Sequence, residues 1–329
     1  MKKMVSTLIT LSLLIFLSGC NAFQQQQAEG TTFDAKVGIV LSDTGLGDGS
    51  FSDAAFQGLE RARNDLNILF DYREAPDGNF EEKLNELVAQ DMSLVIGLGF
   101  TAQEAIEKVA TENPDQQFLL IDGFSEVENV ISMTFKEQEG SFLVGLVAAL
   151  TSNSEIIGFI GGIDEPLIHR FEAGYIAGAT FANPEIEVLV DYVGDFGDAD
   201  LGEEIASKQA ASGADFIYPA AGYSGVGAIL KAQELGIYAA GVDSDQFFVA
   251  EGAVVTSMIK NMDVAVYNLV NSLVEGSIEN EDYDLGLAQN GVGLADIRLI
   301  DLDMNGQALI QDGRNKIISG EIIVPDKKN

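Results

Sequence analysis

The stretch KVGIVLSDTGLGDGSFSDAAFQGLERA, residues 36–62, joins a β-branched apolar run to a glycine-rich turn and then to an amphipathic helical pattern. Strand, glycine turn and helix follow one another in this order in dinucleotide and mononucleotide sites. The glycines Gly45, Gly47 and Gly49 do not form G-x-G-x-x-G, and no Gly-Lys-Ser/Thr follows them. The turn therefore lacks the two glycine signatures of phosphate binding.

The charges in the turn also disfavour a phosphate. The turn carries Asp43, Asp48 and Asp53 with no Lys or Arg before Arg61, so a phosphate would meet like charge. Ionised carboxylates only accept hydrogen bonds, so a neutral ligand rich in N–H or O–H donors suits the turn better. Alternatively, the aspartates only cap the helix and complete turns.

Short apolar runs alternate with helical patterns along most of the chain. Nearly continuous apolar strands between helices predict an α/β fold with parallel sheets covered on both faces. The predicted strands are 36–41, 67–73, 94–99, 117–122, 129–135, 156–162, 187–194, 215–221, 237–243 and 253–259. The predicted helices are 53–65, 79–90, 101–112, 137–151, 169–181, 200–212, 224–235 and 262–275.

These strands are too many for one sheet of ordinary width, and the pattern restarts near residue 155, which predicts two similar doubly wound lobes. Phe51 and Phe171 each stand near the first helix of a lobe. Ligands of open α/β sheets bind at the carboxyl ends of the strands, so the two rings could stack on a flat ligand from opposite sides. Alternatively, both are ordinary core aromatics.

The amino terminus has the pattern of a bacterial secretion signal. Residues 1–20 begin with two lysines, continue through an apolar core and end in Leu-Ser-Gly-Cys, which is typical of a lipoprotein signal peptide in which Cys20 becomes lipidated. Residues 21–35 are polar and of low complexity, which predicts a flexible tether. We therefore expect a protein anchored by lipid to the outer face of the cell membrane.

Composition excludes several classes of function. The formal net charge of −34 argues against a nucleic-acid partner. Cys20 is the only cysteine, which excludes disulfides and thiol catalysis in the globular part, and His169 is the only histidine. We expect no metal and no cofactor, and a nucleoside hydrolase, which would need a metal or a perturbed acid/base pair, is the least favoured alternative.

Several motifs together resemble the basic membrane lipoprotein family, over residues 36 to 296 and in order. They are the turn quoted above, GFTAQEAIEKVA (99–110), FKEQEGSFLVGLVAAL (135–150), GFIGGIDEPLIHRFEAGYIAGA (158–179), GVDSDQ (241–246), TSMIKNMDVAVY (256–267) and GLAQNGVGLA (286–295). The family comprises substrate-binding lipoproteins of ABC importers. Its members of known ligand largely bind purine nucleosides.

The resemblance implies a type I periplasmic-binding fold in which the chain crosses between the lobes three times. Lobe 1 would then take residues 36–135 plus 255–285, and lobe 2 residues 136–254 plus 286–329. The implied partners are a purine nucleoside and the permease and ATPase subunits of an ABC transporter.

The resemblance also implies a ligand shell. Its members are Asp43, Phe51, Asp53, Asp122, Phe171, Gly222, Asp243 and Lys260. A vicinal diol favours a carboxylate acceptor beside a cationic donor, which Asp243 and Lys260 would supply. Asp53 stands where the family usually has Asn, which favours base edges that carry N–H groups. Riboflavin or another ring compound, and a ligand-sensing or regulatory role, remain alternatives.

Overall fold

The first sheet of the computed structural model is built from six parallel strands in the order β11-β5-β4-β3-β1-β2. The structure describes residues 32–278 and 281–328. Strand β3 is buried along its whole length, as an apolar strand covered on both faces requires. The strands are β1 (Ala35–Val40), β2 (Ile68–Arg73), β3 (Leu94–Leu98), β4 (Phe118–Ile121), β5 (Val130–Phe135) and β11 (Tyr283–Leu285).

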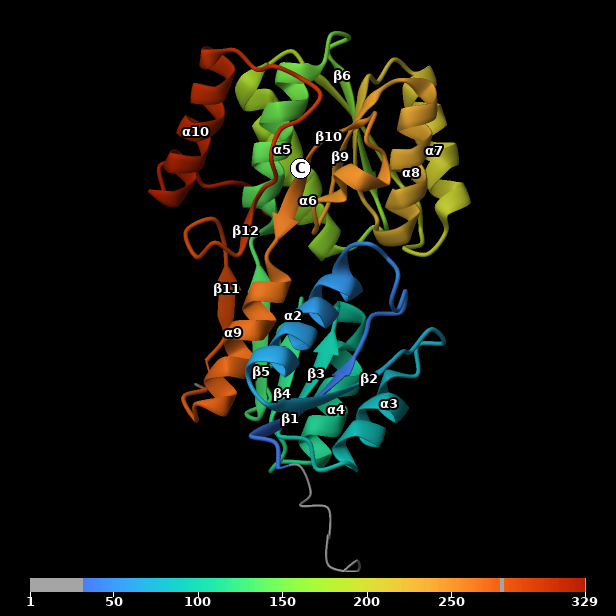
Figure 1. Cartoon of the computed structure of the whole chain (residues 1–329). Helices are drawn as coiled ribbons and strands as arrows, with labels where there is room; N and C mark the ends of the chain where they lie inside the picture. Colours follow the sequence, from blue (N-terminus) through green and yellow to red (C-terminus); the bar gives the residue numbers. More distant parts are fainter. Residues whose placement is uncertain (1–31, 279–280, 329) are drawn as a thin grey trace, which may run out of the picture. The chain divides into compact units, whose positions relative to one another are not determined.

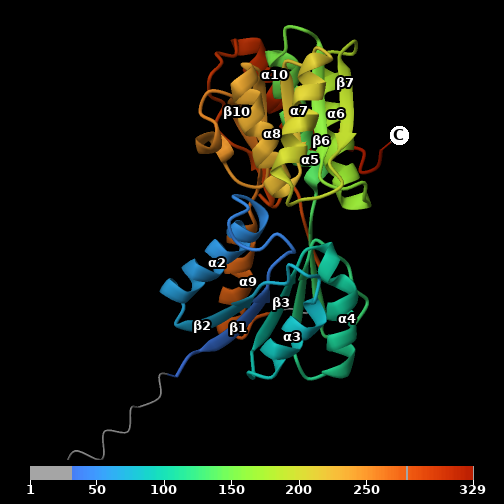
Figure 2. The same ribbon diagram turned by 90° about the vertical axis from the view of Figure 1, so that its right-hand side faces the viewer.

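Two layers of helices cover this sheet, with α3 and α4 on one face and α2 and α9 on the other (Figure 2). A Cβ atom at Gly58 of α2 would lie 2.6 Å from the backbone oxygen of Asp263 in α9, so the bare glycine allows these helices to touch. The helices are α2 (Phe51–Asp65), α3 (Phe80–Val88), η1 (Phe100–Ala102), α4 (Gln103–Glu112) and α9 (Met262–Val274).

The second sheet has the strand order β12-β10-β9-β8-β6-β7, in which β12 alone runs antiparallel to its neighbour. The strand order from β10 to β7 matches the order from β5 to β2 in the first sheet, as two similar lobes require. The strands are β6 (Ile156–Gly161), β7 (Glu187–Tyr192), β8 (Phe216–Ala220), β9 (Tyr238–Gly241), β10 (Val254–Lys260) and β12 (Val292–Leu294).

Helices α5 and α6 cover one face of the second sheet and α7 and α8 cover the other (Figure 1). A Cβ atom at Gly178 of α6 would lie 1.9 Å from the backbone oxygen of Phe142 in α5, which shows how closely that pair packs. Helix α10 packs against α5. The helices are α5 (Glu137–Thr151), α6 (Pro166–Ala182), α7 (Ala199–Ala211), α8 (Gly222–Leu235), η2 (Gln246–Val249) and α10 (Met304–Ile318).

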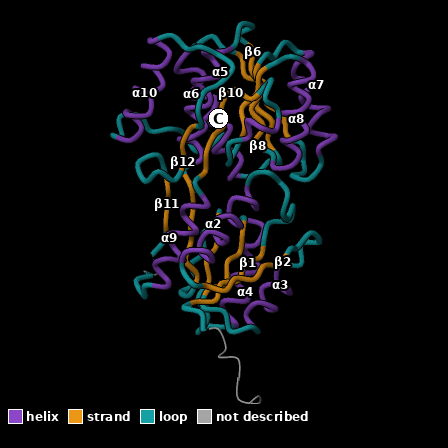
Figure 3. The backbone as a smooth tube through the Cα atoms, viewed as in Figure 1, coloured by secondary structure: helices purple, strands orange, loops and turns teal. Residues whose placement is uncertain are grey.

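The chain passes between the two lobes three times, from β5 to α5, from β10 to α9 and from β11 to β12. Figure 3 shows the third passage on the left, where β12 lies above β11. The predicted boundary at residue 255 was wrong, because residues 255–260 belong to β10, which pairs with β9 in the second sheet. The chain leaves the second lobe only after Lys260.

The predictions for the amino terminus concern residues that the structure does not describe. The signal peptide 1–20, the lipidated Cys20 and the tether as far as residue 31 lie outside the described ranges, and the folded part begins with β1 at Ala35. Among the described residues, no helix is long and apolar enough to span a membrane.

Candidate ligand-binding site

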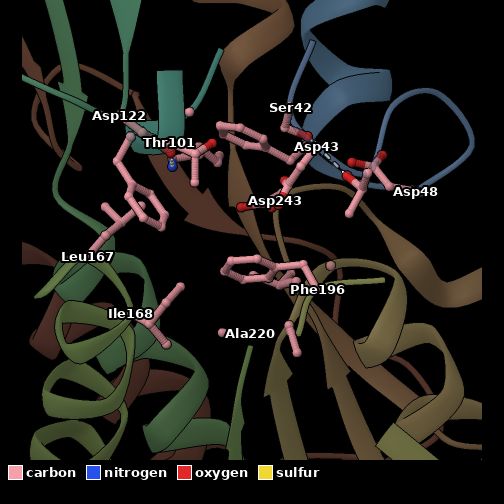
Figure 4. A pocket seen from close by; sticks show the side chains of 18 of the residues that line it. Ser42, Asp43, Asp48, Thr101, Asp122, Leu167, Ile168, Phe196, Ala220 and Asp243 are labelled. Carbon is pink, nitrogen blue, oxygen red and sulfur yellow. Dashed lines mark hydrogen bonds and ion pairs between the residues drawn. The ribbon is translucent and has the colours of Figure 1, made fainter. Parts of the chain in front are cut away.

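A pocket of about 630 Å³ is lined by residues that follow the carboxyl ends of strands in both lobes (Figure 4). This is the place where open α/β sheets bind small molecules. Seven residues of the predicted ligand shell line it, and Asp53 does not. The seven are Asp43, Phe51, Asp122, Phe171, Gly222, Asp243 and Lys260.

Asp48 and Asp53 stabilise the glycine-rich turn by accepting hydrogen bonds from its backbone amides. The sequence left open whether these aspartates bind a ligand or only cap the helix. The Asp53 carboxylate accepts hydrogen bonds from the backbone N–H groups of Gly47 (2.9 Å) and Gly49 (3.0 Å). Both glycines have a positive φ, which bends the turn back over the start of α2. Asp53 therefore serves the turn with both of its oxygens, and its contact with the ligand stays a prediction.

Asp48 is buried and also stabilises the turn. Its carboxylate accepts hydrogen bonds from the backbone N–H groups of Ser50 (3.0 Å) and Ser52 (2.8 Å). Burial raises the pKa of Asp48, although these amides oppose the shift. The two aspartates thus fix the backbone immediately before Phe51, the first residue of α2, and Phe51 is placed at the pocket.

The second lobe contributes two phenylalanines with different surroundings. Phe171 lines the pocket but is only 4% exposed and belongs to the hydrophobic core. Phe196, in the loop between β7 and α7, is half-buried and also lines the pocket. Figure 4 shows the Phe196 side chain on the second-lobe side of the pocket, across from Asp43 and Thr101. Phe171 therefore lines the pocket while it packs in the hydrophobic core.

Phe196 rests in a slot made by two glycines. A Cβ atom at Gly162 would lie 2.2 Å from Cε1 of the Phe196 ring, and one at Gly222 would lie 3.2 Å from the Phe196 backbone oxygen. That oxygen accepts a hydrogen bond from the backbone N–H of Ser224 (2.9 Å). Gly222, predicted as a ligand residue, also leaves room for this aromatic. An aromatic in the polar turn VGDFGDAD (193–200) was the pattern by which Phe196 could have been found.

Lys260 is buried at the boundary between the two lobes. Its Nζ lies 2.5 Å from Oδ2 of Asp122 and 3.0 Å from Oε1 of Glu137. It also lies 5.2 Å from the ring centroid of Phe51. Burial opposes the charge, but the carboxylates of Asp122, Glu137 and Asp243 outweigh burial and raise the pKa of Lys260. Asp243 and Lys260 both line the pocket, as the predicted acceptor and donor for a diol require, and the direct ion pairs of Lys260 are with Asp122 and Glu137.

Asp122 and Asp243 occupy matching places in the two lobes. Asp122 directly follows β4, Asp243 follows β9 after one residue, and both have a left-handed backbone, with φ of 60° and 63°. Within the described residues, Oδ1 of each is buried without a hydrogen-bond partner. Oδ2 of Asp243 accepts a long hydrogen bond of 3.4 Å from the Ser50 hydroxyl. A buried acceptor without a donor is costly, so both oxygens are available to donors on a ligand.

Burial in this acidic cluster also shifts Asp243. Desolvation raises its pKa to about 7, with Lys260 opposing the shift and Asp122, Asp48 and Glu137 adding to it. Asp243 therefore changes between a donor and an acceptor near neutral pH.

The site offers a ligand hydrogen-bond acceptors, one cation and aromatic faces. Among the side chains that the structure describes, no group of three or more His, Cys, Asp or Glu residues could hold a metal ion. His169 does not line the pocket, and its Nε2 lies 2.6 Å from Oδ1 of Asp164. The arrangement suits a neutral molecule with a flat ring and several hydroxyl or N–H donors.

The chain matches a known protein family and is similar to several known proteins. Residues 35–328 match the Bmp family, described as ABC transporter substrate-binding protein PnrA-like. The CD4+ T-cell-stimulating antigen of Listeria innocua is 33% identical over 342 residues, covering 95% of each chain. The ABC transporter nucleoside-binding protein BmpA of Lactococcus lactis is 30% identical and covers 99% of this chain and 100% of its own.

A solved structure agrees with the fold. A solute-binding protein of an ABC transporter system from Aeropyrum pernix K1 superposes with a TM-score of 0.82 at 27% identity, covering 90% of this chain and 94% of that one. The predicted fold class of two doubly wound parallel-sheet lobes is confirmed.

Proposed function

Because the chain belongs to the Bmp family of ABC transporter substrate-binding proteins, we propose that it binds a purine nucleoside and presents it to an importer. The family resemblance found in the sequence is confirmed, and the family is one of binding proteins rather than enzymes. A relative of similar length is named a nucleoside-binding protein. The observation that carries the proposal is that Oδ1 of Asp122 and Oδ1 of Asp243, in the pocket that Lys260 also lines, are buried without a hydrogen-bond partner in the part of the chain that the structure describes.

The ribose would bind at these carboxylates. Its hydroxyl groups supply the donors that Oδ1 of Asp122 and Oδ1 of Asp243 lack, and the Lys260 ammonium can donate to a ribose oxygen. Hydrogen bonds to charged groups in a buried site are strong, so this region would fix the sugar.

The purine would lie between Phe51 of the first lobe and Phe196 of the second. The sequence suggested Phe171 as the second ring, but Phe196 is the less buried of the two pocket phenylalanines of the second lobe. We propose that Phe171 instead forms the wall beside Lys260, whose Nζ lies 5.8 Å from its ring centroid. A flat base between two aromatic faces gains stacking on both sides.

The cellular setting follows from the family and the sequence. We propose that Cys20 carries a lipid, that residues 21–35 tether the folded part to the outer face of the membrane, and that permease and ATPase subunits of an ABC transporter are its partners. Replacing Cys20 by Ala would then release a soluble protein that still binds its ligand. Retention of that variant in the membrane fraction would contradict the single anchor.

Calorimetric titration of the folded part with inosine, guanosine, adenosine, riboflavin and ribose tests the ligand class. We expect the purine nucleosides to bind more tightly than riboflavin and ribose. Inosine 5′-monophosphate should bind far more weakly than inosine, because its phosphate would be desolvated beside Asp48, Asp122 and Asp243. Tight binding of riboflavin, or equal binding of inosine and its monophosphate, would contradict the proposal.

A further inference from the structure

Glu137 is buried beside the pocket without lining it. It is the first residue of α5, directly after the chain crosses from β5 into the second lobe, and its side chain is 0% exposed. A buried carboxylate needs partners, and each oxygen of Glu137 forms an ion pair, although the one at Oε1 lacks hydrogen-bond geometry. Oε1 lies 3.0 Å from Nζ of Lys260, and Oε2 lies 3.4 Å from Nη1 of Arg170.

Arg170 ties this carboxylate to the partly exposed face of α6. Its Nη1 also donates to the backbone oxygen of Phe135, the last residue of β5. Arg170, Glu137, Lys260 and Asp122 therefore form a row of alternating charge that begins on α6 in the second lobe and ends after β4 in the first. Glu137 is the member of this row that joins the pocket lysine to a residue outside the pocket.

The position of Lys260 determines whether the Asp243 carboxylate is free to bind a ligand. An ammonium has three donors and no acceptor, and two carboxylates, those of Asp122 and Glu137, already face it. Asp243 is close enough for its charge to act on Lys260, yet its Oδ1 has no partner among the described residues. Without Glu137, the lysine would have one partner fewer and would be drawn toward Asp243, where it would occupy the oxygen that now lacks a partner among the described residues.

We propose that Glu137 is a positioning residue: it holds Lys260 at Asp122, on the boundary between the lobes, and so leaves the free oxygen of Asp243 for the ligand. The ligand part of this proposal rests on the proposed function. The positioning itself does not, and it can be measured in the protein without ligand.

The titration of Asp243 reports the position of Lys260. Removing the Glu137 charge takes away one carboxylate that raises the pKa of Asp243, and it frees Lys260 to lower that pKa further. Both effects have the same sign, so the pKa of Asp243 should fall from about 7. The charged or titratable groups that face Asp243 are Asp48 in the first turn, Asp122 after β4, Glu137 on α5, Tyr218 on β8 and Lys260 on β10.

The first test follows the ¹³C signal of the Asp243 carboxyl from pH 5 to 9 in ligand-free protein with labelled aspartate, with Asp243→Asn to assign the signal. We expect Glu137→Gln to lower the midpoint by about one pH unit or more. The matched control is Glu172→Gln, which neutralises a buried glutamate of α6 that binds the Tyr192 hydroxyl instead of Lys260. It should leave the midpoint unmoved. A midpoint in Glu137→Gln equal to that of wild type would overturn the proposal.

A second variant covers the case in which Glu137→Gln does not fold. Arg170→Met removes the cation on the outer side of Glu137, where the Arg170 side chain is 34% exposed. The whole charge of Glu137 then acts on Lys260 and its neighbours, so the midpoint of Asp243 should rise. A fall, or no change, would contradict the positioning role.

The last test adds ligand. In wild type, the affinity for inosine should increase as pH rises through the midpoint of Asp243, because the ionised carboxylate is the acceptor for a ribose hydroxyl. In Glu137→Gln this increase should begin at lower pH, while at pH 8 the affinity should be about tenfold weaker because Lys260 now occupies Asp243. An unchanged profile would overturn the proposal. If wild type binds no nucleoside at any pH, the proposed function fails, and the carboxyl titration still decides the role of Glu137.

Discussion

The two turns that present aromatic rings to the pocket do so by different means. In the first lobe, Asp48 and Asp53 bind the backbone of the turn, and Phe51 is carried in place as the first residue of a helix. In the second lobe, Phe196 belongs to the turn itself, its ring occupies space that Gly162 leaves empty, and Gly222 lies close to its backbone oxygen. Hydrogen bonds to the turn position the Phe51 ring, and a glycine that leaves space positions the Phe196 ring. The two turns should therefore respond to different substitutions.

The largest expected effect separates Phe196 from the other phenylalanine of its lobe. Phe171→Ala should lower the free energy of unfolding by about 3–5 kcal/mol, because a core side chain is lost and a cavity remains. Chemical denaturation and inosine titration of the same samples measure this. Loss of affinity without loss of stability would show that Phe171 stacks on the base. The two turns would then no longer be the elements that present the stacking rings.

Gly162→Ala should act on the second turn alone. The new methyl would lie 2.2 Å from Cε1 of Phe196, so the ring must move, and affinity for inosine should fall about tenfold or more, since stacking on one base contributes roughly 1–3 kcal/mol. Gly197→Ala is the matched control, because its methyl would meet only Oδ1 of Asp195, at 3.5 Å. Equal effects of the two substitutions on the affinity would show that the slot does not position the ring.

Asp53→Asn should weaken the first turn without changing base preference. The amide oxygen can replace one carboxylate oxygen as an acceptor, but the amide nitrogen cannot accept from the second glycine amide, at a cost of about 1–3 kcal/mol in stability. The affinities for inosine and adenosine should fall together. A change in their ratio would return Asp53 to the ligand-contacting role that the sequence suggested.

Ser224→Ala should give the smallest effect, again on the second turn. The Ser224 hydroxyl donates to the backbone oxygen of Asp195 and accepts from the backbone N–H of Asp198, both at 2.9 Å. Its loss should cost about 1 kcal/mol of stability and a few-fold in affinity, because the hydrogen bond from Ser224 N–H to Phe196 remains. Hydrogen exchange at the Asp198 amide should accelerate, and unchanged exchange there would contradict this account of the turn.

The sequence predicted the architecture well because its strands are apolar and regular. All ten predicted strands and all eight predicted helices are present, with small shifts at their ends. The strands β11 and β12 are only three residues long, which is too short for a recognisable period, and they were not predicted. The boundary at residue 255 failed because β10 looks like any other buried strand in the sequence, and only its pairing with β9 assigns it to a lobe.

The residues of the site were predicted only in part. The family resemblance implied Asp122, Asp243 and Lys260 as ligand residues, and all three line the pocket, but which carboxylate Lys260 binds depends on how the lobes meet. The sequence could not show that Asp53 binds the turn, because a carboxylate in a glycine turn can bind the turn or a ligand. Phe196 was missed because its slot is made by glycines at positions 162 and 222, which are remote from it in the chain.

The most direct test of the account is a double-mutant cycle of Phe51→Ala and Phe196→Ala with inosine, measured by calorimetry on folded protein. We expect each single change to reduce affinity about tenfold to hundredfold, with little loss of stability, because both rings are only partly buried. The double variant should depart from additivity by roughly 0.5–3 kcal/mol, because both rings would contact the same base. Full affinity in Phe196→Ala, or strict additivity of the two losses, would contradict a base held between the two turns.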